Sequence, residues 1–280
     1  MEIKYLTNEV VVEGLKEFSL RDTLDCGQCF RWNEAGDGFD GIVEGKYCHA
    51  SQDGDTLKLS CVTKEEFDSL WSDYFDLERD YDMLKEGFRA DVMLAETLRF
   101  APGIRVLRQR PWETLCSYII SQNNNIKRIK GIVARLCENF GEPLADGHGY
   151  AFPTAERLAE LDEEALAPIR CGFRAKYIID ASRKVASGEI ELDKLCGMEI
   201  DEARRTLMTI KGVGPKVAEC TLLYGFGRTE CFPIDVWMKR AMAELFPEGL
   251  PECALKDAGI AQQYIFHYMR MRGAESASSQ

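Results

Sequence analysis

The sequence lacks any long apolar run. No stretch of about 18 uncharged apolar residues occurs in the 280 residues, so we expect no membrane-spanning segment. The chain begins MEIKYLTNEVVVEGLKEF, with acidic residues where a secretory signal has a basic end followed by an apolar stretch. We therefore expect an intracellular protein, in the cytoplasm or nucleoid if the source is prokaryotic, with no membrane partner.

Histidine is scarce, with three residues, and the eleven cysteines are scattered along the chain. A chain of this length needs no disulfide staples, so we expect free thiols. The one CxxC, at residues 26–29, has no second pair for zinc and precedes a strand-like segment at 29–32, unlike a thioredoxin-type motif. Cys116, Cys137 and Cys220 lie in apolar helical patterns, which small buried hydrophobic residues fit. The sequence therefore predicts no metal site.

An overall excess of basic charge is also absent, since the formal net charge is −12. The imbalance lies in residues 1–100, with 23 acidic and 11 basic residues, whereas residues 101–280 hold 24 of each. Within the second part, residues 101–135 carry seven basic residues and one acidic residue. Screening cuts off fields beyond about 8 Å at physiological salt, so an anionic ligand responds to local charge. This segment is compatible with nucleic-acid binding, although a solvated helix face explains the same charges.

The pattern of the chain predicts an α+β fold. Short strand-like bursts separated by turn residues run from residue 9 to 62, and helical periodicity follows a capping-box pattern at residues 63–66. We expect an N-terminal antiparallel sheet domain with flanking helices over residues 1–100 and a larger helical domain over 101–280. The expected helices are 64–74, 91–99, 111–121, 126–139, 154–160, 173–186, 201–209, 215–224, 235–245 and 257–270.

Residues 207–220 (LMTIKGVGPKVAEC) have the pattern of two helices joined by a tight turn, a hairpin over about 205–224. Gly212 and Gly214 form the turn, and Pro215 suits the first position of the second helix. Glycines let the backbone approach a ligand, and the N–H groups that open a helix carry the positive end of its dipole. Such a hairpin binds a phosphate without a basic side chain, although a plain helix connection gives the same pattern.

Lys216 and Asp235 are the candidate chemical groups. Lys216 lies one turn into the second helix, where the helix dipole and burial in a cleft disfavour the charged amine and favour the neutral form that a nucleophile requires. Asp235 precedes an amphipathic helix and suits its N-cap, which stabilises a helix by about 1 kcal/mol. A carboxylate that faces the amine could also accept its proton and stabilise positive charge developing on a sugar ring. The two residues together predict a nucleophile with a supporting carboxylate.

Six blocks of sequence resemble the helix-hairpin-helix DNA glycosylases, and within them the 8-oxoguanine DNA glycosylase/AP lyases. The similarity extends over residues 20–270, nearly the whole chain. The blocks are residues 27–32 (GQCFRW), 121–126 (SQNNNI), 171–177 (CGFRAKY), 212–220 (GVGPKVAEC), 233–236 (PIDV), and Ala261 and Gln262 with Phe266.

The resemblance implies how the site works. Lys216 is the family's nucleophile, which attacks C1′ of the damaged nucleotide, expels the base and forms a Schiff base; Asp235 is its essential carboxylate, and β-elimination then breaks the strand. The base would be read by the carbonyl of Gly27, by Gln262 on the Watson–Crick edge, and by Cys220 and Phe266 on its two faces. A plain helix-surface glutamine remains the alternative for residue 262.

The resemblance also implies a DNA interface. Asn123 fills the space of the extruded nucleotide, while Arg128 and Arg174 hydrogen-bond the orphaned cytosine. Phe173 wedges beside it, where the family more often has tyrosine. Gly212 and Gly214 contact the backbone of double-stranded DNA that contains an oxidised purine. The family resemblance is compatible with a structural monovalent ion at the hairpin carbonyls. We expect no iron–sulfur cluster or other cofactor, and we expect a monomer because nothing in the sequence suggests an obligate dimer.

Three alternatives are weighed against this interpretation. The iron–sulfur branch of the superfamily needs a C-terminal cysteine quartet, but only Cys231 and Cys253 follow Cys220. The branch that removes alkylated bases generally keeps the aspartate and lacks the lysine, so Lys216 argues against it. A non-catalytic DNA-binding protein could use the hairpin alone, and Lys216→Gln separates that class from an enzyme.

Overall fold

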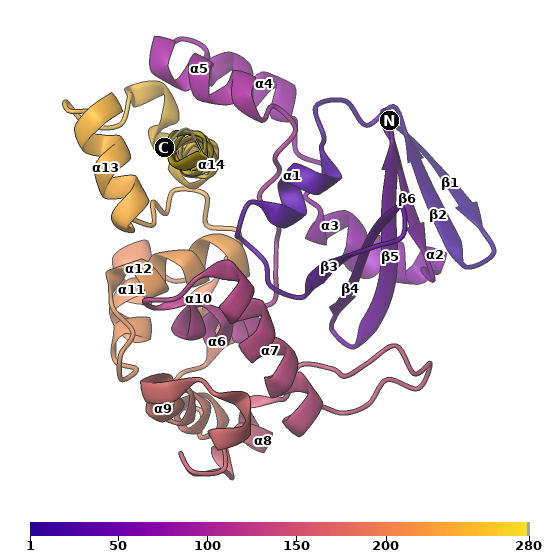
Figure 1. Cartoon of the computed structure of the whole chain (residues 1–280), viewed down its shortest axis with the longest axis vertical. Coiled ribbons are helices and arrows are strands. Elements are labelled where there is room, and N and C mark those ends of the chain that lie inside the picture. The colour runs from indigo at the N-terminus through magenta and orange to yellow at the C-terminus, as the bar shows by residue number, and fades with distance from the viewer. Residues whose placement is uncertain (279–280) are drawn as a thin grey trace. The chain divides into compact units, whose positions relative to one another are not determined.

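The computed structural model describes residues 1–278 and confirms the predicted α+β fold (Figure 1). The antiparallel sheet has the strand order β1-β2-β6-β5-β4-β3. Its strands are β1 (Glu2–Leu6), β2 (Glu9–Glu13), β3 (Trp32–Ala35), β4 (Gly38–Val43), β5 (Lys46–Asp53) and β6 (Thr56–Ser60). None of the helices in the described residues is long and apolar enough to cross a membrane.

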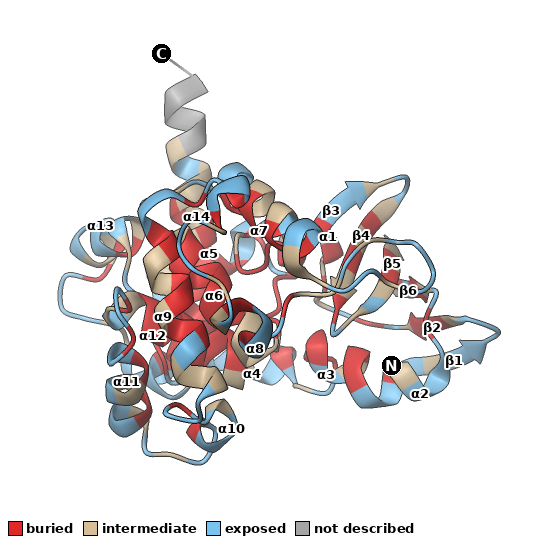
Figure 2. Cartoon of the chain, turned by 90° about the horizontal axis from the view of Figure 1, so that it is seen from below, coloured by how far each residue is buried: buried red, intermediate tan, exposed pale blue. Residues whose placement is uncertain are grey.

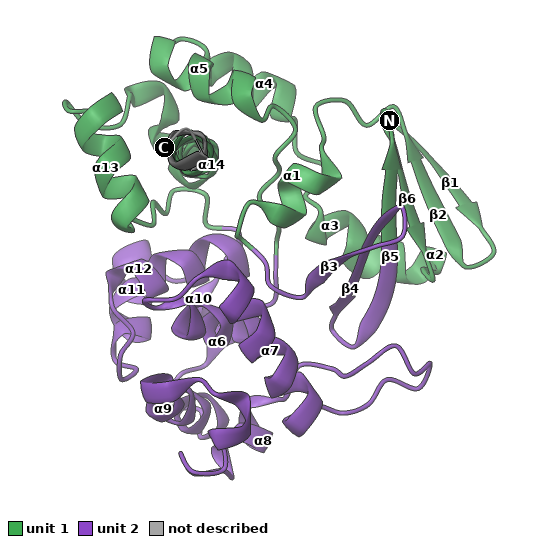
Figure 3. Ribbon diagram, in the orientation of Figure 1, with its two compact units in different colours: residues 1–28, 50–108, 228–280 green, residues 29–49, 109–227 purple. Residues whose placement is uncertain are grey.

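The chain divides into two compact units (Figure 3). Unit 1 comprises residues 1–28, 50–108 and 228–280, and unit 2 comprises residues 29–49 and 109–227. The division passes through β5, whose first residues belong to unit 2 and whose last belong to unit 1. The division of the sequence at residue 100 into a sheet domain and a helical domain remains a prediction.

In unit 1, strand β2 pairs with β1 on one side and with β6 on the other. Val10 lies opposite Leu59 and Val12 opposite Leu57, and all four side chains are buried. β1 was not expected, because its side chains are mostly exposed and it shows no alternation of buried and exposed positions. A strand at the edge of a sheet with mostly exposed side chains has no alternating apolar pattern by which it could be predicted.

Five helices of unit 1 begin after a side chain that caps them. The capping box predicted at residues 63–66 is confirmed: the Thr63 hydroxyl accepts from the Glu66 N–H at 3.2 Å, and the Glu66 carboxylate accepts from the Thr63 N–H at 3.1 Å. The helices are α1 (Leu20–Asp25), α2 (Lys64–Glu66), a π-helical turn (Phe67–Trp71), α3 (Ser72–Tyr74), α4 (Tyr81–Phe88), α5 (Val92–Phe100), α13 (Val236–Leu245), a 3-10 turn (Glu252–Asp257) and α14 (Ala258–Ser278). The five capped helices are α1, α2, α4, α5 and α13.

Unit 2 is built around α6, in which residues 114–120 are all buried (Figure 2). Pro111 occupies its first position, where the missing N–H has no partner to lose. The other helices are α7 (Ile126–Phe140), α8 (Ala155–Ala159), 3-10 turns (Ala167–Ile169 and Gly172–Arg174), α9 (Ala175–Ala186), α10 (Leu192–Leu195), α11 (Ile200–Met208), α12 (Pro215–Cys220) and a π-helical turn (Thr221–Gly225) that continues α12.

The structure corrects several local expectations. Residues 29–31 were interpreted as part of a strand, but β3 begins only at Trp32. Helices α1, α4 and α10 were not expected. The helix expected over 64–74 is present but contains a π-helical turn over Phe67–Trp71.

His49 links stability to pH in unit 2. Its Nδ1 lies 2.7 Å from Oδ1 of Asp40 and its Nε2 lies 3.1 Å from Oδ1 of Asp37. The hydrogen bond to Asp40 is the main cause that raises the pKa of His49 above its ordinary value. The ion pairs therefore stabilise the fold below pH of about 6.5, and this contribution is lost as the pH rises through the raised pKa.

We expect His49→Gln to lower the free energy of unfolding most at low pH. Denaturant titrations of both proteins at pH values from about 5 to 9 measure the difference, which should shrink as the pH rises. A difference that is constant over this range would show that the imidazolium does not carry the effect.

Candidate active site

The residues predicted from the sequence are divided between the two units, and each group is described within its own unit. Unit 2 contains Asn123, Arg128, Phe173, Arg174, Gly212, Gly214, Lys216 and Cys220. Unit 1 contains Gly27, Asp235, Gln262 and Phe266.

The hairpin between α11 and α12 is held in place by α9. The carboxylate of Asp180 accepts a hydrogen bond from the Lys211 N–H at 2.7 Å, and the Lys184 amine donates to the Thr209 carbonyl at 3.0 Å. Ile210 and Val213 are buried. The turn therefore has one fixed conformation, and sequence patterns had not indicated Asp180 or Lys184 as its supports.

The two glycines of the hairpin serve different purposes. Gly212 has a φ of +78°, and a Cβ there would lie 2.5 Å from the ring of Tyr177. Its missing side chain thus permits both the left-handed backbone and the packing on α9. Gly214 forms the N-cap of α12, and a Cβ there would meet no atom within 4 Å. Gly214 is therefore the position at which the backbone is open to a ligand.

The amine of Lys216 is held by two groups of α6. Its Nζ donates to the Ser121 hydroxyl at 3.2 Å and lies 4.8 Å from the centre of the Tyr118 ring. The Ser121 hydroxyl donates its own proton to the Tyr118 carbonyl at 2.8 Å, so toward Lys216 it acts as an acceptor. The Tyr118 ring is stacked on Tyr224 with 5.4 Å between centroids. Lys216 is half-buried, and its amine has a defined position in unit 2.

Cys220 follows Lys216 by four residues on α12 and is buried. Residues four apart lie on one face of a helix, so the thiol and the amine share a face. The contact of Cys220 with a face of the base, which the resemblance implies, stays a prediction.

Asn123 and its neighbours form an exposed turn that a buried arginine supports. Arg174 is 2% exposed, and its guanidinium donates to the carbonyls of Gln122 at 2.9 Å, Asn123 at 3.0 Å and Cys171 at 3.1 Å. Asn123 is exposed with a φ of +47°. Arg174 thus holds the backbone that presents Asn123, a role not foreseen from the sequence.

Phe173 and Arg128 are exposed in the same unit. Phe173 is 51% exposed, and the Arg174 guanidinium lies 4.4 Å from its ring centre. The Arg128 side chain is exposed at the start of α7, where the Asn125 side chain caps the helix by accepting from the Arg128 N–H at 2.9 Å. Asn125 therefore serves as the N-cap of α7, whereas the Asn123 side chain takes no part in this cap. A large exposed aromatic ring suits insertion into a base stack.

In unit 1, Asp235 is the N-cap of α13. Its Oδ1 accepts from the Met238 N–H at 2.8 Å, which confirms the capping interpretation. Within residues 1–278, Oδ2 has no hydrogen-bond partner, and the carboxylate is half-buried. The cap therefore uses one oxygen of Asp235 and leaves the other for chemistry.

Gln262 is a buried polar side chain on α14. It is 5% exposed, so the alternative of an ordinary surface glutamine is wrong. Its Oε1 is buried and has no hydrogen-bond partner among the described residues. A buried acceptor without a partner costs about 1–3 kcal/mol, which a bound ligand with a donor would recover. Phe266 lies one turn later and is half-buried, and Gly27 has a φ of +91°, which favours glycine.

The CxxC motif lacks the chemistry of a redox or zinc site. The Cys26 thiol is fully buried and donates to the Thr23 carbonyl at 3.2 Å, and burial raises its pKa to about 12. Metal binding and disulfide exchange need the thiolate, which such a thiol does not form near neutral pH. Within the described residues, no group of three or more His, Cys, Asp or Glu side chains could hold a metal ion.

Two protein families match adjacent parts of the chain. Residues 10–115 match the 8-oxoguanine DNA glycosylase N-terminal domain, and residues 116–249 match the HhH-GPD superfamily base excision DNA repair proteins. The boundary between the two matches lies within α6.

The chain is similar in sequence, and in one solved structure also in fold, to several DNA repair enzymes. The N-glycosylase/DNA lyase of Saccharomyces cerevisiae is 42% identical over 152 residues, which cover 49% of this chain and 40% of that enzyme. The probable N-glycosylase/DNA lyase of Methanothermobacter thermautotrophicus is 30% identical over 75% of this chain and 76% of its own length. The 8-oxoguanine glycosylase/lyase of Clostridium acetobutylicum, solved with double-stranded DNA containing cytosine opposite 8-oxoguanine, is 36% identical with a TM-score of 0.90, covering 98% of this chain and 99% of that chain.

Proposed function

The chain belongs to the HhH-GPD superfamily of base excision DNA repair proteins, and from this premise we propose that it is a bifunctional 8-oxoguanine DNA glycosylase and AP lyase. The observation that carries the proposal is the Lys216 amine, which the hairpin and α6 hold at the N-terminal turn of α12. The similarity to the Clostridium acetobutylicum glycosylase/lyase along nearly the whole chain supports the same substrate.

In the proposed reaction, the lone pair of the Lys216 amine attacks C1′ of the damaged nucleotide. The bond between C1′ and the base breaks, the base leaves with the bonding electrons and takes up a proton, and the sugar opens to a Schiff base on Lys216. Positive charge develops on the sugar in the transition state, and the Asp235 carboxylate stabilises it electrostatically. This assignment agrees with an Asp235 side chain that uses one oxygen as a helix cap and has the other available.

The Schiff base then enables strand cleavage. The imine withdraws electrons and acidifies the hydrogens on C2′, and loss of one of them expels the 3′ phosphate by β-elimination. Hydrolysis of the imine afterwards frees the lysine. These steps need an amine and a carboxylate, with no metal ion or redox cofactor.

The proposed specificity depends on a single proton of the base. 8-Oxoguanine carries a hydrogen on N7, where guanine carries a lone pair, so the Gly27 carbonyl attracts the first base and repels the second. The unpartnered Oε1 of Gln262 supports a second contact, because the Watson–Crick edge of either purine offers it N–H donors. Recognition by groups that would otherwise stay unpaired gives strong discrimination.

The damaged nucleotide must leave the base stack before any of these contacts form, at a cost of a few kcal/mol. We propose that Asn123 fills the vacated space, that Phe173 wedges beside it, and that the exposed Arg128 hydrogen-bonds the opposite cytosine. The Arg174 guanidinium already donates to three backbone carbonyls and is 2% exposed, so we assign it to holding the Asn123 turn and no longer to the cytosine. Double-stranded DNA is the partner, and a monomer suffices because one chain supplies every proposed group. The hairpin would bind the DNA backbone at Gly212 and Gly214.

The proposed function is tested by incubating the protein with a duplex that contains one 8-oxoguanine opposite cytosine, with and without borohydride. We expect release of the base, a nicked strand and, with borohydride, a covalent protein–DNA adduct. Base release without an adduct would indicate a monofunctional glycosylase, and binding without base release would indicate a non-catalytic module. Either result would overturn the proposal.

Arg128 is expected to enforce a preference for cytosine opposite the lesion. We expect Arg128→Ala to reduce the ratio of excision opposite cytosine to excision opposite adenine by about tenfold, because one good pair of hydrogen bonds to a base contributes about 1–3 kcal/mol of discrimination. Single-turnover rates with each of the four opposite bases measure it. Arg157→Ala, at an exposed arginine paired with Glu160 on unit 2, is the control. Equal turnover opposite all four bases by the unmodified protein would remove this role.

A further inference from the structure

Gln28 is a fully buried glutamine next to Gly27, and its amide joins three backbone groups. Its Nε2 donates to the carbonyls of Thr23 at 2.8 Å and Arg105 at 2.7 Å. Its Oε1 accepts from the Leu107 N–H at 2.9 Å. One side chain therefore ties the segment that carries Gly27 to a segment of unit 1 almost eighty residues further along the chain.

The extended residues 104–107 also contact α14, the helix that carries Gln262. The hydroxyl of Tyr264 donates to the Ile104 carbonyl at 2.6 Å. Tyr264 is fully buried and lies two residues after Gln262. Hence residues 104–107 are hydrogen-bonded to Gln28, which follows Gly27, and to Tyr264 of α14. We call these four residues with Gln28 and Tyr264 the bracket.

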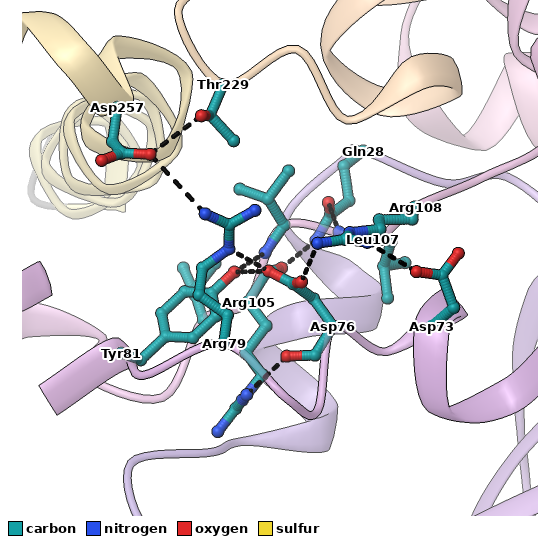
Figure 4. Close-up of polar contacts among 12 residues, drawn as sticks. Gln28, Asp73, Asp76, Arg79, Tyr81, Arg105, Leu107, Arg108, Thr229 and Asp257 are labelled. Atoms are coloured by element: carbon teal, nitrogen blue, oxygen red, sulfur yellow. Dashed lines mark hydrogen bonds and ion pairs between the residues drawn. The ribbon is translucent and has the colours of Figure 1, made fainter. Parts of the chain in front are cut away.

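A network of charged groups in unit 1 fixes the bracket in turn (Figure 4). The Arg105 guanidinium donates to the Asp76 carbonyl at 2.7 Å, and the Val106 N–H donates to the Tyr81 hydroxyl at 2.9 Å. The same hydroxyl donates to the buried Asp76 carboxylate at 3.0 Å, which also accepts from Arg79 and Arg108. Asp76 and Tyr81 thus hold Arg105 and Val106, the two middle residues of the 104–107 segment.

We propose that Gln28 is a positioning residue for base discrimination: through the bracket it fixes the direction of the Gly27 carbonyl relative to the Gln262 amide. This inference rests on the proposed function, in which both groups read the base. Gln28 itself touches no base in this scheme. It acts by limiting the rotation of the peptide group between Gly27 and Gln28, which contains the Gly27 carbonyl. Gly27 itself has a φ of +91°.

The physical reason is the sensitivity of a hydrogen bond to direction. The preference for 8-oxoguanine arises from one carbonyl and one N–H, and hydrogen bonds weaken steeply when they bend. A glycine is the residue whose backbone rotates most freely, so the reading carbonyl needs an external constraint. A shift of about 1 Å in a reacting or reading group costs up to a hundredfold in rate.

The test uses Gln28→Met, a side chain of similar length without hydrogen-bonding groups. Single-turnover rates are measured on two duplexes, one with 8-oxoguanine opposite cytosine and one with a preformed abasic site opposite cytosine. The abasic site needs Lys216 but has no base to read. We expect excision of 8-oxoguanine to fall about tenfold or more and strand cleavage at the abasic site to stay within about threefold.

Gln52 provides a matched control in unit 1. Its amide also joins three backbone groups, donating to the carbonyls of Phe18 and Gly54 at 2.8 Å each and accepting from the Leu20 N–H at 2.6 Å. We expect Gln52→Met to lower the melting temperature, as Gln28→Met does, and to leave the ratio of the two rates at the wild-type value. If Gln28→Met lowers both rates by one factor, as loss of folded protein would, the positioning role is wrong.

Two further measurements keep the proposal testable if Gln28→Met does not fold. Tyr264→Phe removes one hydrogen bond of the bracket and keeps the aromatic ring. We expect it to lower the ratio of 8-oxoguanine excision to abasic-site cleavage by about threefold. In a Lys216→Gln background, Gln28→Glu should reduce the preference for binding 8-oxoguanine:cytosine over guanine:cytosine duplexes. An unchanged ratio and preference would overturn the inference. A wild-type protein that cleaves abasic sites and excises no 8-oxoguanine would instead refute the proposed function.

Discussion

Replacing Lys216 with glutamine is expected to abolish base excision and borohydride trapping while leaving the binding of damaged duplex within a few fold. The amide nitrogen of glutamine is not a nucleophile, so no Schiff base forms, and the rate falls by at least about a thousandfold. Glutamine is one bond shorter than lysine and adds no bulk, so α12 should not shift even if the hydrogen bond that Lys216 makes to the Ser121 hydroxyl at 3.2 Å is lost. Single-turnover excision, adduct formation and duplex affinity are measured on the same preparations.

Lys194→Gln is the matched control for this experiment. Lys194 is an exposed lysine of α10 in the same unit, paired with Glu191, and the change removes the same charge. It should leave excision and trapping at wild-type levels. Excision that survives in Lys216→Gln would show that another amine, or water, attacks C1′.

Asp235→Asn is expected to reduce excision by about a hundredfold to a thousandfold with almost no loss of stability. Asparagine caps a helix about as well as aspartate, so the hydrogen bond from the Met238 N–H, now at 2.8 Å, persists. The negative charge that would stabilise the developing cation is lost. Asp235→Ala should lose the activity and about 1 kcal/mol of stability as well.

The comparison separates the two roles of Asp235, and thermal melts with single-turnover excision measure them. Asp80→Asn is the control, since Asp80 caps α4 in unit 1 by accepting from the Met83 N–H at 2.9 Å. It should change neither property. Full activity of Asp235→Asn would leave the capping role as the whole function of Asp235.

The helices with a sustained apolar period could be predicted from the sequence, whereas α1, α4 and α10 could not. Residues 111–121 give helix α6 as expected, because a proline at the first position precedes a sustained apolar period. Helix α1 (Leu20–Asp25) has six residues and is capped by Ser19, whose hydroxyl accepts from the Asp22 N–H at 3.2 Å. A serine before a segment of this length is also common in loops, so Ser19 alone does not predict a helix.

The site residues that belong to motifs could be identified from the sequence, whereas their supports could not. Lys216 and Asp235 stand in patterns with a chemical meaning of their own. Ser121 matters because it meets an amine 95 residues away in the chain. Gln28 was part of a recognisable block, yet its function follows from contacts with Arg105 and Leu107. Such pairings are created by the fold and leave no local pattern.

Unit 1 is assembled from the two ends of the chain, with residues 109–227 placed between them in sequence. Helix α14 packs against α5, and α13 packs against α14, so unit 1 lacks part of its interior until residues 228–280 exist. During synthesis on the ribosome, the segment with Lys216 therefore emerges before Asp235 and Gln262, the groups of unit 1 that the proposed reaction also uses. We expect unit 1 to complete its fold only after residues 228–280 have been synthesised, because α13 and α14 supply part of its interior.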